Sequence, residues 1–172
     1  VIDLSPHQIV VWVSITSRSH GAATNGILDP NVNRMPAVLD TGFNDAVLLN
    51  ERHLEEWLGI SCKELPLRKE YLTIVHRKIG IEPSVRQQLS TTAVNLPVHD
   101  GLIWLHCPVI NTRDQFSEAP AVKLHLHPGI AVCPQSTDYP RLPLLGLRLL
   151  TDNLLRLVVE RDRRRTNGSY SI

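Results

Sequence analysis

Proline is the residue that most limits which folds this chain can adopt. Twelve prolines are spread along the 172 residues, against nine glycines. Proline has no backbone N–H and a fixed φ, so it interrupts helices and is excluded from central strands. Between the prolines lie short runs rich in Val, Ile, Leu and Thr, which favour strands. The sequence therefore predicts a mainly β fold, a closed or nearly closed small barrel with one or two short helices.

Strands are expected where apolar residues run together or alternate with polar ones. The alternation is cleanest over residues 122–127, and Pro97 must lie at an edge or a bulge. The turn-rich stretches 17–33 and 111–120 are expected to be loops. The strands predicted in this way are 8–16, 35–39, 46–49, 71–79, 93–110, 122–127, 130–132 and 154–160.

One helix is predicted over residues 51–58. Asn50 precedes it as an N-cap residue and Gly59 follows as a C-cap residue. Within it, Leu54, Trp57 and Leu58 fall at helical spacing. A second, shorter helix is expected around residues 148–152.

Composition and charge are those of an ordinary globular protein. Apolar residues make up 42%, charged residues 20%, and the formal net charge is +1. One domain over residues 1–165 is predicted, followed by a polar tail over 166–172. The near-neutral charge predicts no nucleic-acid partner, and the basic cluster at Arg161, Arg163, Arg164 and Arg165 is interpreted as solvated.

The chain contains no run of about 18 apolar residues, so no transmembrane helix and no membrane partner are expected. The first residues lack the pattern of a signal peptide. Cys62, Cys107 and Cys133 are odd in number and widely spaced, which favours reduced thiols over a disulfide framework. These observations together predict a cytoplasmic location.

The tripeptide Asp40-Thr41-Gly42 follows the apolar residues 37–39. Two carboxyl groups about 3 Å apart can hydrolyse an amide without a metal or a covalent nucleophile, because they share one proton. One then acts as a base towards water and the other as an acid. The geometry requires a rigid loop after a strand, a hydroxyl to hold it, and a small residue for close backbone approach. Asp40-Thr41-Gly42 supplies these, although an Asp-Gly turn is also a common structural loop.

A second element strengthens the catalytic interpretation. The residues Leu144-Leu145-Gly146 precede the short helix expected at 148–152. An apolar pair before Asp-Thr-Gly, followed about a hundred residues later by two apolar residues, a glycine and a helix, resembles the retropepsin-like single-domain aspartic peptidases. The lead-out over residues 40–49 is similar as well. Motif-level similarity covers residues 36–58 and 141–160.

The resemblance implies an aspartic endopeptidase that needs no metal or cofactor. The chain carries one such Asp, so the second carboxylate must come from a second copy in a two-fold homodimer. The substrate would be a peptide or protein bound between the subunits. The implied site residues are catalytic Asp40, the loop supports Thr41, Gly42, Leu144, Leu145 and Gly146, and the substrate contacts Asn44 and Asp45. The segments Val10–Ile15 and Leu154–Val159 are the expected interface strands.

Two features depart from the family pattern. The hairpin that closes over substrate usually has a glycine-rich tip, but the candidate region 71–107 offers only Gly80 and Gly101. The spacing from Asp40 to Gly146 is longer than in the retroviral members, which implies an insertion around residues 108–140.

Other functions are compatible with parts of the sequence. A catalytically inactive dimeric peptide-binding module of the same fold is the alternative. His125 and His127 could bind a metal with His106 or Cys107, but an exposed strand face is the simpler interpretation. Cys107 and Cys133 each precede a proline, and nothing nearby indicates an activated thiol.

Overall fold

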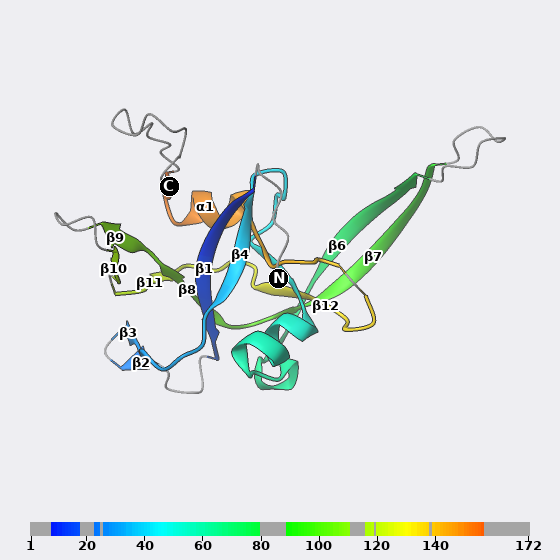
Figure 1. Ribbon diagram of the computed structural model, residues 1–172. Helices are drawn as coiled ribbons and strands as arrows, with labels where there is room; N and C mark the ends of the chain where they lie inside the picture. The colour runs from blue at the N-terminus through cyan, green and yellow to red at the C-terminus, as the bar shows by residue number, and fades with distance from the viewer. Residues whose placement is uncertain are drawn as a thin grey trace, which may run out of the picture.

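The computed structural model describes residues 8–17, 23–24, 26–79, 89–110, 116–118, 120–137 and 139–156. Its fold is mainly β, as predicted, with short helical segments (Figure 1). The strands are β1 (Ile9–Thr16), β2 (Ala23–Thr24), β3 (Ile27–Leu28), β4 (Met35–Asp40), β5 (Val47–Asn50), β6 (Leu67–Ile79), β7 (Leu89–His99), β8 (Leu102–His106), β9 (Pro108–Ile110), β10 (Phe116–Glu118), β11 (Val122–Leu124), β12 (Ile130–Cys133) and β13 (Leu144–Gly146). The helical segments are the π-helix η1 (His53–Leu58), the 3₁₀-helix η2 (Cys62–Glu64) and the α-helix α1 (Leu147–Asp152).

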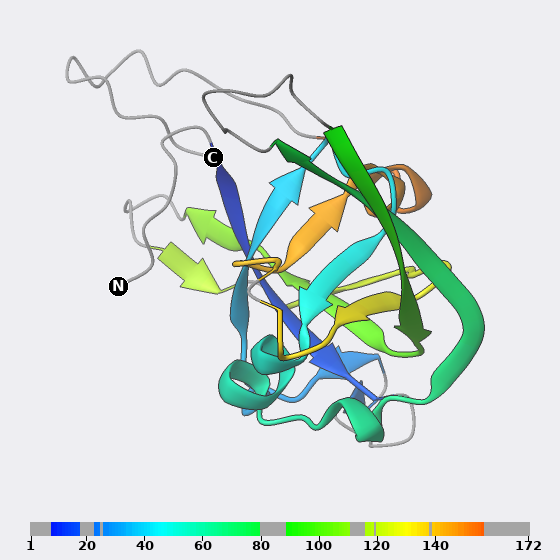
Figure 2. The ribbon, with the colours of Figure 1, turned by 90° about the vertical axis from the view of Figure 1, so that its right-hand side faces the viewer.

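Nine strands form one mixed sheet in the order β11-β8-β1-β4-β13-β5-β12-β7-β6. This sheet is open, so the closed barrel expected from the sequence is wrong for the described residues. Closure would require the two edge strands, β6 and β11, to pair with each other, and the described residues of these strands do not. Strand β6 pairs with β7 alone, and the two strands leave the body together as a long arm (Figures 1 and 2).

In the centre of the sheet, strands from distant parts of the chain pair with one another. Strand β13 lies between β4 and β5, parallel to the first and antiparallel to the second. Strand β12 runs parallel to β5 on its other side. Strand β1 pairs with β4 over Ile9–Val13 and with β8 over Trp12–Thr16. The expected interface strand over Val10–Ile15 is therefore an internal strand, whose pairing groups are largely used within the chain.

The main hydrophobic core lies on one face of the curved sheet and is closed by η1. Its fully buried side chains include Val13, Ile15, Leu49, Leu54, Ile103 and Ile130. A smaller cluster on the opposite face joins Leu48, Leu96, Val98, Ala131 and Cys133. Alternate side chains of a strand point to opposite faces, so β5, buried on both, reads as a continuous apolar run.

The helix predicted over residues 51–58 is confirmed. Asn50 Oδ1 accepts a hydrogen bond from the Arg52 N–H at 3.0 Å, and Gly59 ends the segment with φ of 68°. That left-handed conformation favours glycine. Helix α1 likewise matches the short helix expected around 148–152.

Several expected boundaries were wrong. The strand predicted over 93–110 is divided into β7, β8 and β9, and β11 ends at Leu124. Residues 154–156 are not a strand, because Leu154 turns the chain away with φ of 52°; residues 157–160 lie outside the described part. Pro97 does lie beside an irregularity, since the β6–β7 register shifts between Leu67 and Tyr71.

The polar tail 166–172 and the arginines at 161–165 also lie outside the described residues. Within the described part of the chain, no helix has the length and apolar character needed to cross a bilayer.

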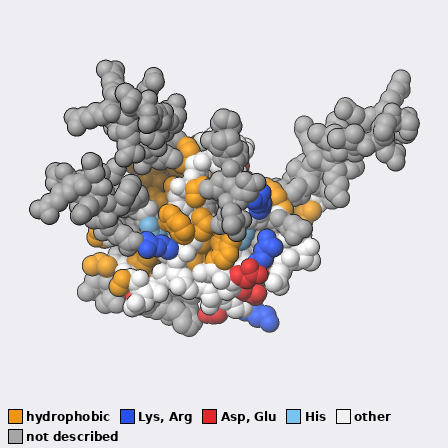
Figure 3. All heavy atoms as spheres, in the orientation of Figure 1, with side chains coloured by type: hydrophobic (Ala, Val, Ile, Leu, Met, Phe, Trp, Pro, Cys, Tyr) orange, Lys and Arg blue, Asp and Glu red, His pale blue; other side chains and the backbone are white. Residues whose placement is uncertain are grey.

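Apolar side chains gather near the centre of the face shown in Figure 3.

Candidate active site

Asp40 is the last residue of β4, and its side chain is partly exposed. The turn that follows folds back on this carboxylate, because the Gly42 N–H donates to Asp40 Oδ1 at 2.9 Å. The Phe43 N–H also donates to the Asp40 carbonyl at 3.2 Å. Thr41 and Gly42 are exposed at the surface of the turn. The motif thus forms a tight loop that presents one carboxylate to solvent.

The second predicted motif lies directly beside the first. In the parallel pairing of β13 with β4, Leu145 is opposite Leu39 and Gly146 is opposite Asp40. The Val38 N–H donates to the Pro143 carbonyl at 2.8 Å at the start of this pairing. The structure therefore brings together two segments that lie far apart in the sequence, and Leu145 is buried in the main core, against which Leu39 also packs.

Two backbone hydrogen bonds hold Gly146 and Leu147 against the Asp40 loop. The Gly146 N–H donates to the Ala46 carbonyl at 2.9 Å, and the next N–H, of Leu147, donates to the Phe43 carbonyl at 2.7 Å. A Cβ atom on Gly146 would come closer than 3.0 Å to the carbonyl oxygens of Phe43 and Asp45. Only glycine permits this approach.

The two predicted substrate contacts differ in their surroundings. Asn44 is exposed, whereas the Asp45 carboxylate lies 3.6 Å from the guanidinium of Arg148 on α1. Both charged groups remain partly exposed, so the pair contributes about 0–1 kcal/mol. Its structural effect is to connect α1 to the loop. The sequence pattern did not identify Arg148, because no spacing rule indicates which loop a short helix will contact.

A further segment, residues 134–143, lies close to the loop and is anchored by Asn50. The buried Asn50 amide nitrogen lies 3.0 Å from the Pro134 carbonyl oxygen and 2.7 Å from that of Thr137. Burial raises the pKa of the Tyr139 phenol, and the negative charges of Cys133 and Asp40 raise it further. The sequence indicated only a helix cap at Asn50.

The candidate flap region, residues 71–107, corresponds to the β6–β7 arm together with β8. The arm is the longest hairpin among the described strands, and residues 80–88 at its tip lie outside the described part. Gly101, the other glycine of the region, is buried between β7 and β8.

The residues weighed for other chemistry are dispersed. His125 and His127 are exposed while Leu124 and Leu126 are buried, as the alternation predicts, although the strand itself ends at Leu124. His106 Nε2 lies 2.9 Å from Ser14 Oγ. Among the described residues, no three His, Cys, Asp or Glu side chains gather as a metal site. Cys133 is only 4% exposed and burial raises the pKa of its thiol to about 11, so the thiol is neither ionised nor accessible to a substrate.

The candidate site therefore consists of the Asp40 loop, Gly146 with the strand before it, and the start of α1, with the segment 134–143 nearby. Comparisons of the chain with protein-family models, with curated proteins and with solved structures found no match.

Proposed function

We propose that this chain is an aspartic endopeptidase whose active site forms between two copies, each supplying one Asp40 carboxylate. The observation that carries the proposal is the pairing of Gly146 with Asp40, because it joins both sequence motifs in one rigid loop cluster. The threading of β13 between β4 and β5 supports a retropepsin-like arrangement of the strands around the site.

The proposed chemistry follows from two carboxyl groups that share one proton. The ionised carboxylate takes a proton from the attacking water, and the protonated one donates to the carbonyl oxygen of the scissile amide. The Gly42 N–H orients one oxygen of the carboxylate, which leaves the other directed to the reaction. A rigid loop matters because misplacing the reacting groups by about 1 Å can cost about 100-fold in rate.

A second copy of the chain is required by stoichiometry. One Asp-Thr-Gly is present, so a dyad needs a two-fold axis beside the Asp40 loop. The surface around this loop supports such contact, because Thr41 and Gly42 are exposed and the neighbouring Leu147 on α1 is 40% exposed. The partner is therefore proposed to dock on the face formed by this loop and α1, in place of the interface strands expected from the sequence.

Digestion of a peptide library at about pH 5 tests the proposal. The wild type should cleave, and Asp40→Asn should not, because the amide cannot share the proton. Asp29→Asn is the matched control: Asp29 is exposed in another turn, where its Oδ1 accepts from the Asn31 N–H at 2.8 Å. Cleavage by Asp40→Asn at the wild-type rate would exclude the dyad. Peptide binding without cleavage by the wild type would instead support the alternative, an inactive binding module.

A further inference from the structure

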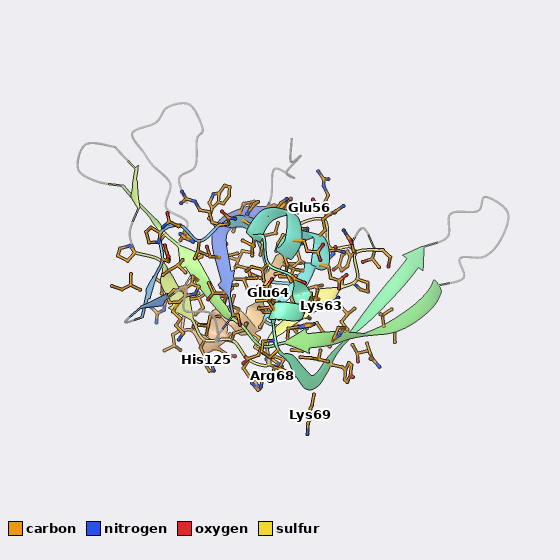
Figure 4. The ribbon with its side chains drawn as sticks, turned by 90° about the horizontal axis from the view of Figure 1, so that it is seen from below. Glu56, Lys63, Glu64, Arg68, Lys69 and His125 are labelled. Carbon is orange, nitrogen blue, oxygen red and sulfur yellow. The ribbon has the colours of Figure 1, made fainter. Side chains whose placement is uncertain are left out.

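A separate pocket of about 510 Å³ lies at the base of the β6–β7 arm. Its apolar walls include Leu65, Leu67, Pro97 and Val132. Its polar lining consists of Cys62, His99 and the charged side chains Glu51 and Lys63. Figure 4 shows η2, with Lys63 and Glu64, beside the base of this arm. Pro134, at the start of the segment anchored by Asn50, lines this pocket, but none of residues 40–46 does. The pocket is therefore distinct from the Asp40 loop.

Cys62 and His99 form a paired thiol and imidazole in this pocket. His99 is 8% exposed, and its Nδ1 lies 3.0 Å from the Leu65 carbonyl oxygen. A carbonyl only accepts hydrogen bonds, so Nδ1 must carry the proton and Nε2 of the neutral ring is left as an acceptor. Cys62 Sγ lies 3.4 Å from that Nε2. The backbone thus fixes the tautomer in which His99 can accept the thiol proton.

The thiol is protonated at rest. Burial raises the pKa of Cys62 to about 11, and the negative charges of Glu51 and Glu55 contribute. A reagent that needs a preformed thiolate will therefore react slowly here. The reaction becomes fast only when an electrophile stays bound in the pocket, because His99 can then take the proton as the bond to sulfur forms.

We propose that this pocket is a covalent binding site for small apolar α,β-unsaturated carbonyl compounds. The Cys62 sulfur bonds to the β carbon, and the electron pair of the C=C bond moves through the α carbon to the carbonyl oxygen. The thiol proton passes to His99 Nε2 and then to the α carbon of the enolate. The net reaction is an addition of the thiol across the C=C bond, so it needs no leaving group and no oxidant.

The lining of the pocket favours this class of ligand. Apolar walls suit a hydrocarbon body, and a few polar groups at one end suit a single reactive carbonyl. Two charged side chains line the pocket: the positive charge of Lys63 favours the developing enolate oxygen, and the negative charge of Glu51 opposes it. A charged electrophile would lose hydration on entering the apolar part of the pocket.

The test uses cyclohex-2-en-1-one and the full chain carrying Cys107→Ser, which removes the exposed thiol. Adduct formation is followed by intact mass, and the modified cysteine is identified by peptide mapping. We expect the adduct on Cys62, with a rate that saturates as the enone concentration rises. Cyclohexanone, which binds but cannot add, should slow the reaction. The buried Cys133 serves as an internal control.

Two variants test the role of His99 as a base and the effect of the negative charge of Glu51 on Cys62. His99→Asn keeps a donor for the Leu65 carbonyl but removes the base, so the rate should fall about 100-fold. Glu51→Gln retains an acceptor for the Gln135 N–H, which donates to Glu51 Oε2 at 3.0 Å, and should accelerate the reaction by removing a negative charge. The second variant remains decisive if the first fails to fold, which circular dichroism would reveal. A rate linear in enone, a rate unchanged or lowered by Glu51→Gln, or an adduct mainly on Cys133 would overturn the proposal.

Discussion

Replacing Gly146 by Ala tests what holds the Asp40 loop in place. The added Cβ would lie closer than 3.0 Å to two backbone carbonyl oxygens and to the Phe43 ring. Backbone atoms cannot move aside as a flexible side chain can, so either the loop or β13 has to shift. The shift must weaken the two hydrogen bonds that join Gly146 and Leu147 to the loop.

The expected cost can be worked out from these contacts. Overpacking of a well-packed site costs about 1–3 kcal/mol. Each of the two weakened hydrogen bonds adds about 0.5–1.5 kcal/mol. The free energy of unfolding should therefore fall by about 2–6 kcal/mol, a large part of the roughly 5–15 kcal/mol typical of a domain. Urea unfolding followed by tryptophan fluorescence would measure this change.

Gly42→Ala is the matched control in the same loop. Its Cβ would lie 3.2 Å from Asp40 Oδ1, the end of a side chain that can rotate, and Gly42 is exposed. Its unfolding free energy should stay within about 1 kcal/mol of the wild type, while cleavage should fall because the carboxylate is displaced. If Gly146→Ala unfolds at the same urea concentration as Gly42→Ala, the close approach does not constrain the loop as described.

Three further predictions concern pH, metal and assembly. Burial lowers the pKa of His53 from its ordinary value of 6.5, so the unfolded chain binds the proton more readily than the folded chain. The contribution of His53 to thermal stability should therefore be complete above pH 6.5 and should decrease as the pH drops below it. The variant His53→Gln should flatten this decrease in Tm, whereas a matched variant at an exposed histidine, His125→Gln, should leave it in place. Activity and Tm should both survive excess EDTA; a loss that zinc restores, and that the double variant His125→Ala/His127→Ala abolishes, would favour the metal hypothesis. Activity per mole of chain should fall on dilution wherever the dimer dissociates, and analytical ultracentrifugation showing a monomer that still cleaves would refute the shared site.

Local signals in the sequence identified the longer elements near the start of the chain, but not the short strands β2 and β3, which lie in the stretch 17–33 expected to be a loop. The apolar runs of β1, β4 and β5 and the caps of the helix at 51–58 each depend on neighbouring residues, and each was predicted. The strand expected from the apolar residues after 153 was wrong at its start. Leu154 there adopts a turn, and the Leu155 N–H donates to the Leu150 carbonyl at 2.9 Å. Apolar composition alone does not distinguish a strand from the end of a helix.

The candidate site was predictable only where a motif defines it. Asp40 and Gly146 were identified from their neighbours, and the structure places them side by side. Asn50 and Arg148 acquire their roles from partners distant in the sequence, which no local pattern encodes. The same holds for the Cys62–His99 pair, since the two residues meet only because β7 ends beside η2.

Mixing wild type with Asp40→Asn tests most directly whether each chain supplies one catalytic carboxylate. The two forms would be unfolded together, refolded at constant total concentration, and assayed for peptide cleavage. Random pairing makes the proportion of wild-type dimers the square of the wild-type fraction. Activity at an equal mixture should therefore be about a quarter of that of the wild type. A value of about one half, with activity linear in the wild-type fraction, would contradict the shared dyad and indicate a complete site within each chain.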